Sequence, residues 1–139
     1  MSDFELHPRL AADTRLVTDW SLCRVLLMND ARYPWLILVP RRPNLRDLHE
    51  IDPGESATLF EEIRSASNAL QRLHSPVKMN VAALGNQVSQ LHIHVIARFD
   101  DDPAWPGPVW GVGDAKAYPE TAISAVLETL KDALQNGPV

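Results

Sequence analysis

The chain has 139 residues and a mass of 15.5 kDa, which predicts a single domain spanning residues 1–139. Hydrophobic residues make up 45% and charged residues 22%, a balance that excludes a disordered tail, a collagen-like chain and a coiled coil. The formal net charge is −5, whereas proteins that wrap nucleic acid usually carry a positive charge, so no nucleic-acid partner is expected.

The cysteine count and the lack of a long apolar run indicate the cellular compartment of the protein. The single cysteine, Cys23, cannot form an internal disulfide and has no partner for a structural zinc site. No apolar run approaches the ~20 residues that cross a bilayer, and the polar N-terminus, broken by Pro8, is unlike a secretory signal. We therefore expect a cytoplasmic protein without a membrane partner.

Hydrophobic periodicity and turn-forming residues predict two hairpins and two principal helices, which together make an α+β fold with an antiparallel sheet. A short N-terminal helix is expected to be capped by Asp3 and limited by Pro8. In chain order, the expected elements are that short helix within 3–13, strands at 22–28 and 36–39, a helix that starts at 52–55 and ends at Pro76, strands at 77–84 and 91–98, and a helix near 119–135 with Gly137 just past its end.

Two of the five histidines lie one residue apart in the segment Gln90-Leu91-His92-Ile93-His94-Val95-Ile96. Because side chains at i, i+2 and i+4 of a strand point the same way, Gln90, His92 and His94 are expected to share one face and to form a pocket floor. A neutral imidazole can attack phosphorus, and a second imidazole beside it can donate to phosphate oxygens as charge develops. Backbone N–H groups of the turn at Gly85 could add a small anion-binding nest.

Spacing alone leaves two other interpretations of the His92 and His94 pair open. The pair can lie on the surface, or its imidazoles can be satisfied by neighbouring groups. It can also bind a metal ion, although zinc requires three or four ligands and no carboxylate lies at a recognisable nearby spacing before the run 100–102.

The stretch 85–96, Gly-Asn-Gln-Val-Ser-Gln-Leu-His-Ile-His-Val-Ile, resembles the signature of the histidine-triad (HIT) superfamily. That signature is His-φ-His-φ-His-φ-φ, where φ is an apolar residue, and it follows a turn of the Gly-Gln-Ser/Thr type. The resemblance spans about residues 14–111, because a strand–turn–strand unit ending at Pro40, a long helix and a strand with Asn80 precede the motif in the family's order. The Trp-Pro-x-Pro-x-Trp loop at 105–110 is similar to that of bacterial members, and the resemblance is specific around 80–98.

The resemblance implies a HIT-like α+β homodimer with an antiparallel sheet of about five strands and two principal helices. It implies cleavage of a nucleotide at the α-phosphate, with His92 as the nucleophile that forms a nucleotidyl-histidine and His94 as a hydrogen-bond donor to the phosphoryl oxygens. The implied substrate-binding residues are Asn80 and Gln87 at the phosphates or leaving group, Gly85 and Asn86 in the turn beside them, Asn29 at the ribose, and apolar residues near Leu22 and Leu27 at the base.

Two positions depart from the family's pattern. Gln90 stands at the first triad position, where it can hydrogen-bond but cannot shuttle a proton, so its support of the leaving group or the imidazole is altered. The family's histidine in the first hairpin, usually within a Pro-x-His step, is missing, and Trp35-Leu36 occupies that region. Both departures leave the nucleophile His92 in place and affect the expected rate and substrate choice. Gln90, His92 and His94 are the expected catalytic residues.

Several other residues have a functional interpretation beside a structural one. Three arginines after the second strand either attract a polyphosphate or lie at a solvated strand end. Arg98 either shares the face of His94 or pairs with the run 100–102, and two tryptophans either stack on a base or pack at a core edge. The arginines are Arg41, Arg42 and Arg46, the tryptophans are Trp105 and Trp110, Cys23 is expected in the core, and His7, His49 and His74 are given no role.

The sequence thus predicts a nucleotide hydrolase or transferase that needs no metal cofactor of its own, although a divalent ion could accompany a polyphosphate substrate. Dinucleoside polyphosphates and nucleoside phosphoramidates are the expected substrate classes. Because two family histidines are missing, a nucleotide-binding or interaction module with little catalytic activity is the alternative.

Overall fold

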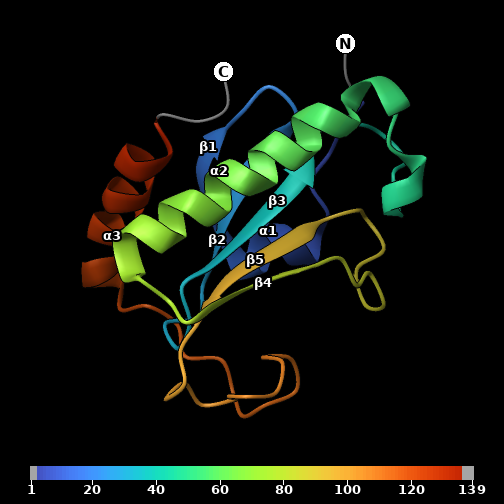
Figure 1. Ribbon diagram of the computed structural model, residues 1–139. Helices are drawn as coiled ribbons and strands as arrows, with labels where there is room; N and C mark the ends of the chain where they lie inside the picture. The colour runs from blue at the N-terminus through green and yellow to red at the C-terminus, as the bar shows by residue number, and fades with distance from the viewer. Residues whose placement is uncertain (1–2, 136–139) are drawn as a thin grey trace.

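The computed structural model describes residues 3–135, and its five strands form one antiparallel sheet in the order β1-β2-β3-β5-β4 (Figure 1). This confirms the expected α+β fold with two principal helices. The elements are α1 (Pro8–Asp13), β1 (Thr14–Asp19), β2 (Cys23–Met28), β3 (Trp35–Pro40), two single 3₁₀ turns (Leu48–Glu50 and Pro53–Glu55), α2 (Ser56–His74), β4 (Lys78–Ala82), β5 (Ile93–Arg98) and α3 (Glu120–Leu134).

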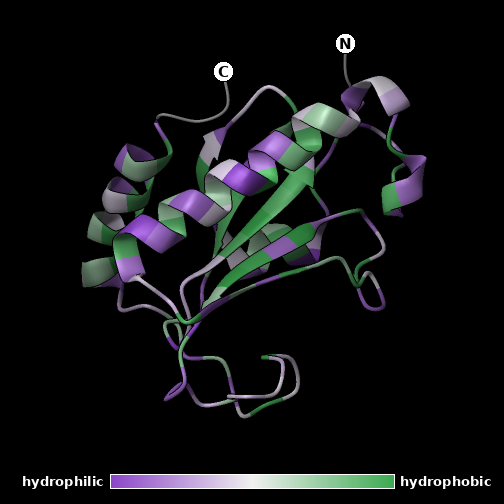
Figure 2. Cartoon of the chain, in the orientation of Figure 1, coloured by the Kyte–Doolittle hydropathy of each residue, from purple (hydrophilic) through white to green (hydrophobic). Residues whose placement is uncertain are grey.

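The central strand β3 is buried along its whole length, because both faces of the sheet are covered. α2 crosses one face and α1 lies behind the other (Figure 1). Leu36 and Leu38 pack into the larger apolar cluster under α2 and α3, whereas Trp35 and Ile37 belong to a smaller cluster on the opposite face. A strand covered on both sides carries a long apolar run, which is why β3 is green over most of its length in Figure 2.

The helix α2 is fixed to the first strands by a buried carboxylate. Glu62 accepts hydrogen bonds from the backbone N–H groups of Leu22 (3.0 Å) and Cys23 (2.7 Å) and from the hydroxyl of Ser21 (3.1 Å). Cys23 is fully buried, as expected of a core thiol, and burial together with the charge of Glu62 raises the pKa of this thiol. Asp52 accepts from the N–H of Gly54, which agrees with the predicted start of this helical region.

Three local expectations were wrong. The strand β1 was not anticipated, because its pattern TRLVTD mixes charged and apolar residues and a bulge interrupts its pairing with β2 near Leu16. The cap of α1 is His7, whose Nδ1 accepts from the N–H of Arg9, and not Asp3. The strand β5 begins at Ile93 rather than Leu91, and the expected helix stop at Gly137 lies outside the described residues.

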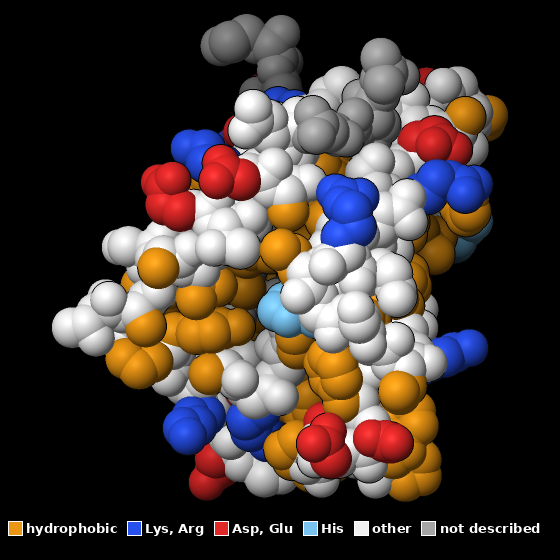
Figure 3. All heavy atoms as spheres, turned by 60° about the vertical axis from the view of Figure 1, so that its left-hand side comes forward, with side chains coloured by type: hydrophobic (Ala, Val, Ile, Leu, Met, Phe, Trp, Pro, Cys, Tyr) orange, Lys and Arg blue, Asp and Glu red, His pale blue; other side chains and the backbone are white. Residues whose placement is uncertain are grey.

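The helices leave part of the apolar surface visible. On the side of the molecule that carries α3, apolar side chains gather in a patch with basic and acidic groups around it (Figure 3). Within residues 3–135, no helix is both long enough and apolar enough to cross a membrane.

Candidate active site

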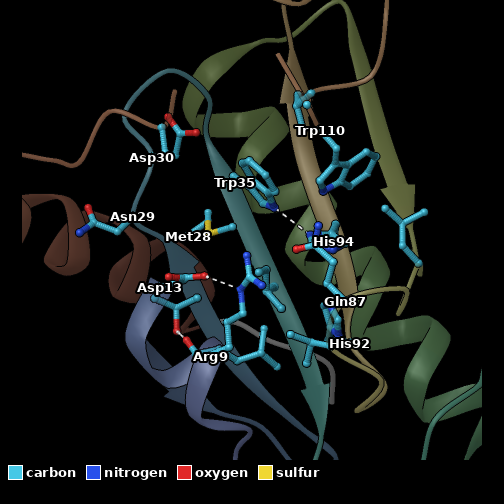
Figure 4. Close-up of a pocket in the computed structure, with 18 of the residues that line it drawn as sticks. Arg9, Asp13, Met28, Asn29, Asp30, Trp35, Gln87, His92, His94 and Trp110 are labelled. Atoms are coloured by element: carbon cyan, nitrogen blue, oxygen red, sulfur yellow. Dashed lines mark hydrogen bonds and ion pairs between the residues drawn. The ribbon is translucent and has the colours of Figure 1, made fainter. Parts of the chain in front are cut away.

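A cavity of about 620 Å³ lies on the sheet face opposite α2 (Figure 4). Its floor is made by β3 and β5, and its walls come from α1, from the turn after β2, from the loop at 84–88 and from the loop at 109–115. Figure 4 shows His92 and His94 on one wall, with Arg9 and Asp13 of α1 on another. Segments far apart in the sequence therefore meet at the two histidines.

His92 lies just before β5 and is nearly buried, at 7% exposure. Its Nδ1–H donates to the backbone carbonyl of Gln90 at 2.7 Å. A carbonyl oxygen can only accept, so the proton of the neutral ring is on Nδ1 and the lone pair is on Nε2. This is the arrangement that a nucleophilic imidazole requires.

His94 lies opposite Ile37 in the β3–β5 pair and has the reverse tautomer. The indole N–H of Trp35 donates to Nδ1 of His94 at 3.0 Å. Because an indole N–H can only donate, the proton of His94 is on Nε2. Burial, with a contribution from the nearby His92, lowers the pKa of His94 to about 4, so this ring is neutral near pH 7.

The two histidine rings are held against each other and against tryptophans. The centroids of His92 and His94 are 4.9 Å apart in an edge-to-face arrangement. His94 also contacts Trp35 at 5.6 Å and Trp110 at 5.0 Å between ring centroids. One ring thus offers a lone pair and its neighbour an N–H group, both at Nε2.

Acidification from pH 7 to pH 5 is expected to lower the free energy of unfolding by about 2 kcal/mol through His94. The unfolded chain binds a proton at the ordinary histidine pKa of 6.5, whereas the folded ring stays neutral down to about 4. The loss therefore begins as the pH falls through 6.5 and levels off below 4. Urea denaturation at both pH values measures this change in the free energy of unfolding. The change should be much smaller in His94→Gln and should persist in the control His49→Gln, at an exposed histidine. An unchanged slope in the His94→Gln protein would contradict the assignment.

The turn before the histidines also lines the cavity. Gly85 has φ of +79°, a conformation that favours glycine, and with Asn86 and Gln87 it faces the same space as His92. At the end of β2, Asn29 lines the cavity as well, and its side-chain oxygen accepts from the N–H of Tyr118 at 2.9 Å. The amide N–H₂ of Asn29 is thereby left as its donor group.

The charged side chains that line the cavity are arranged as two ion pairs. Arg32 binds Asp30 through two guanidinium contacts of 2.9 and 3.0 Å. Burial alone would raise the pKa of Asp30, but the hydrogen bonds from Arg32 and from the backbone of Lys116 outweigh it and keep the pKa below its usual value. The second pair, Arg9 and Asp13 at 3.7 Å, is about half exposed.

Among known protein families, the sequence pattern of the HIT domain matches residues 9–101, which is most of the chain. The chain belongs to the HIT domain family. No curated protein matches it significantly.

Solved structures of HIT proteins are similar along nearly the whole chain. The histidine triad protein of Marinobacter aquaeolei is 45% identical, with a TM-score of 0.93, and the alignment covers 97% of this chain and 98% of that one. The histidine triad protein of Bradyrhizobium japonicum is 44% identical with a TM-score of 0.90, covering 94% and 97%. That of Sinorhizobium meliloti is 42% identical with a TM-score of 0.91, covering 95% and 98%.

Gln90 does not share the pocket floor of this HIT domain, contrary to expectation. Its side chain points to the N-terminal segment, where Nε2 donates to the carbonyl of Glu5 (2.8 Å) and Oε1 accepts from the N–H of His7 (2.8 Å). The extended strand begins only at Ile93, so the strict alternation of side chains does not reach back to residue 90. Gln90 contributes to the site through its backbone carbonyl, which holds His92.

Three other expected substrate contacts lie away from the cavity. The side-chain oxygen of Asn80 accepts from Arg98 at 2.8 Å, and Asn80 is not among the residues that line the cavity. Leu22 and Leu27 are buried in the large cluster under α2, on the other face of the sheet. The apolar lining comes instead from residues such as Met28 and Ile37.

Among the arginines and tryptophans with two interpretations, all but Trp110 lie outside the cavity and have structural contacts. Arg98 is buried and pairs with Asp102 at 2.8 Å, and Trp105 lies 5.6 Å from this guanidinium. Arg41 donates to the carbonyl of Trp20, Arg42 pairs with Glu55, and Arg46 lies in a different depression beside His49, outside the cavity. Trp110, in contrast, lines the cavity.

Sequence reasoning did not identify Trp35, Arg9 or Arg32 as site residues. The only sequence signal for Trp35 is the resemblance, which implies that the family has a histidine in this region of the first hairpin. Arg9 and Arg32 carry no local signature, because only the fold brings α1 and the β2–β3 turn to the same cavity. Within residues 3–135, no group of three or more histidine, cysteine, aspartate or glutamate side chains is arranged to hold a metal ion, so the metal interpretation of His92 and His94 finds no support there.

Proposed function

We propose that this HIT domain is a nucleotide hydrolase or transferase that acts at the α-phosphate through a covalent intermediate on His92. The observation that carries the proposal is the opposite tautomers of the two rings. His92 Nδ1–H is engaged by the Gln90 carbonyl, and His94 Nδ1 is engaged by Trp35, so that a nucleophilic Nε2 and a donating Nε2–H lie on one cavity wall.

The proposed chemistry has two displacement steps at phosphorus. The Nε2 lone pair of His92 forms a P–N bond, the bond from phosphorus to the leaving group breaks, and the leaving group departs with that electron pair. Water then attacks the phosphorus, the P–N bond breaks, its electrons return to Nε2, and the proton of the water passes to solvent. His94 donates its Nε2–H to a non-bridging oxygen during both steps, where negative charge accumulates.

The cavity supports assigning the parts of a nucleotide to different walls. Gly85, Asn86 and Gln87 adjoin His92 and suit the phosphate and leaving group, since backbone and amide N–H groups can bind anions there. Asn29 lies beyond Met28 from the histidines and suits the ribose hydroxyls (Figure 4). Dinucleoside polyphosphates and nucleoside phosphoramidates are the substrate classes to test first.

A homodimer belongs to the same proposal. Its support is the family resemblance together with the edge strand β4, whose Val81 is 47% exposed. Small-molecule nucleotides remain the proposed partner.

A second candidate is a nucleotide-binding module with little catalytic activity. One observation favours it, since the side chain of Gln90 is turned away from the cavity. The resemblance adds that Trp35 stands in the region of the histidine that the family has in the first hairpin. Neither position can then supply a proton to a leaving group.

Trapping the intermediate decides between the two candidates. The wild-type protein is mixed with a diadenosine polyphosphate or an adenosine phosphoramidate, denatured within milliseconds in base and analysed by intact mass. A nucleotidyl addition that is lost in acid and maps to His92 is the expected result, because a histidine phosphoramidate is acid-labile. Tight nucleotide binding without adduct or turnover for either substrate class would instead establish the binding module.

A further inference from the structure

Trp35 is the first residue of β3 and is held in a single arrangement by its surroundings. It is 4% exposed, pairs with Ile96 across the β3–β5 ladder, and packs edge to face on Tyr33 at 6.2 Å and on Trp110 at 6.2 Å between ring centroids. Its indole N–H therefore points in a fixed direction, toward Nδ1 of His94 at 3.0 Å.

The partner of that hydrogen bond is equally constrained. His94 is 5% exposed and in ring contact with Trp35, Trp110 and His92. A proton on Nδ1 would set two N–H groups against each other inside this packed cluster, at the cost of an unmade hydrogen bond. Of the described residues, His92 is the titratable group whose charge acts on His94, and a positive His92 would oppose protonation of His94 further.

We propose that Trp35 is a positioning residue that fixes His94 as an Nε2–H donor, so that His94, at the third position of the triad motif, stabilises the phosphoryl oxygens without carrying a proton between groups. This inference rests on the proposed function for the reaction that His94 assists. Where the resemblance implies a titratable histidine in the family, this chain has Trp35, and its indole N–H fixes the tautomer of His94.

The tautomer is measured directly by ¹⁵N–¹H correlation of the imidazole rings in protein labelled with ¹⁵N-histidine. In the wild type, the His94 ring is expected to show protonated Nε2 and unprotonated Nδ1, with no titration between pH 8 and about pH 5.5. In Trp35→Phe, which keeps an aromatic ring but lacks the donor, both tautomers should be populated and the His94 pKa should rise. For the same variant, kcat should fall roughly 10- to 100-fold with KM within about twofold, since only a transition-state interaction is weakened.

Trp110→Phe is the matched control, because Trp110 touches the same ring while no hydrogen bond joins it to His94 in the described residues. Its His94 spectrum should keep the wild-type tautomer whatever happens to its rate. Replacing Trp35 with β-(3-benzothienyl)alanine, where sulfur stands in place of the ring N–H, repeats the test with the shape of the side chain conserved if Trp35→Phe does not fold.

Two results would overturn the inference: a wild-type His94 that carries its proton on Nδ1 or titrates near pH 6.5, or a Trp35 variant with unchanged His94 signals and unchanged kcat. Failure of the proposed function is a different outcome. It would leave the wild-type ring spectrum as expected, with no nucleotidyl adduct on His92.

Discussion

Replacing His92 with Asn is expected to abolish turnover of an α-phosphate substrate, with a loss in kcat on the order of 10⁴-fold or more. The substitution removes the atom that forms the P–N bond, while the turn at 85–88, Asn29 and the apolar lining stay in place. Nucleotide affinity should therefore change only a few-fold. Steady-state rates measured with a nucleoside phosphoramidate, together with calorimetric binding of the nucleoside monophosphate, check both parts.

The control is His74→Gln, at an exposed histidine in the last turn of α2 that is not among the residues lining the cavity. Its kcat and KM should match those of the wild type. A His92→Asn protein that keeps more than about a tenth of the wild-type kcat would show that another group attacks the phosphorus.

Replacing Asp102 with Asn is expected to lower the free energy of unfolding by about 3–5 kcal/mol, because it leaves the buried Arg98 without its counter-charge. The side chains of the pair are 1% and 4% exposed, and Asp102 also accepts from the backbone N–H groups of Phe99 and Trp105. Its hydrogen bond with Arg98 lowers the pKa of Asp102 to about 2. This stabilisation is fully present above the usual pKa of 3.8 and is lost as the pH falls toward 2.

Urea denaturation near pH 7 measures the effect, with Asp101→Asn as the matched control, since Asp101 is its exposed neighbour. The control should stay within about 0.5 kcal/mol of the wild type. Because Arg98 also donates to the carbonyl of Gly107, the Asp102 variant should loosen the loop that carries Trp110 into the cavity. A loss of less than about 1 kcal/mol would mean that the pair adds little to stability.

Most of the fold could be predicted because its elements follow simple patterns. The apolar run of β3, the helical stripe of α2 and the turn formers between β2 and β3 each have one local interpretation, and all three were confirmed. β1 was missed because an edge strand with Arg15 and a bulge satisfies no period-2 pattern. Its strand geometry comes from pairing with β2, a tertiary effect that propensity does not capture.

The site was predictable only in part, for a related reason. The spacing of His92 and His94 correctly brought the two rings together, and Gly85 to Gln87 joined them at the cavity. The same spacing failed for Gln90, since the strand geometry that it assumes begins three residues later. The hydrogen bond of Asn80 with Arg98, 18 residues away, could not be predicted, because the sequence does not reveal which of several polar groups a buried guanidinium binds.

One face of β5 packs into the core under α2 and the other lines the cavity, and this limits which sequence changes the strand tolerates. A one-residue shift in the register of β5 against β3 would turn Ile93 and Val95 toward the cavity and His94 toward α2, destroying the hydrophobic core and the chemistry together. The loops at 84–88 and 109–115 carry no such penalty, since their lengths can change without moving the strand. Engineers who want a different leaving group should therefore build their libraries in those loops and leave the strand untouched.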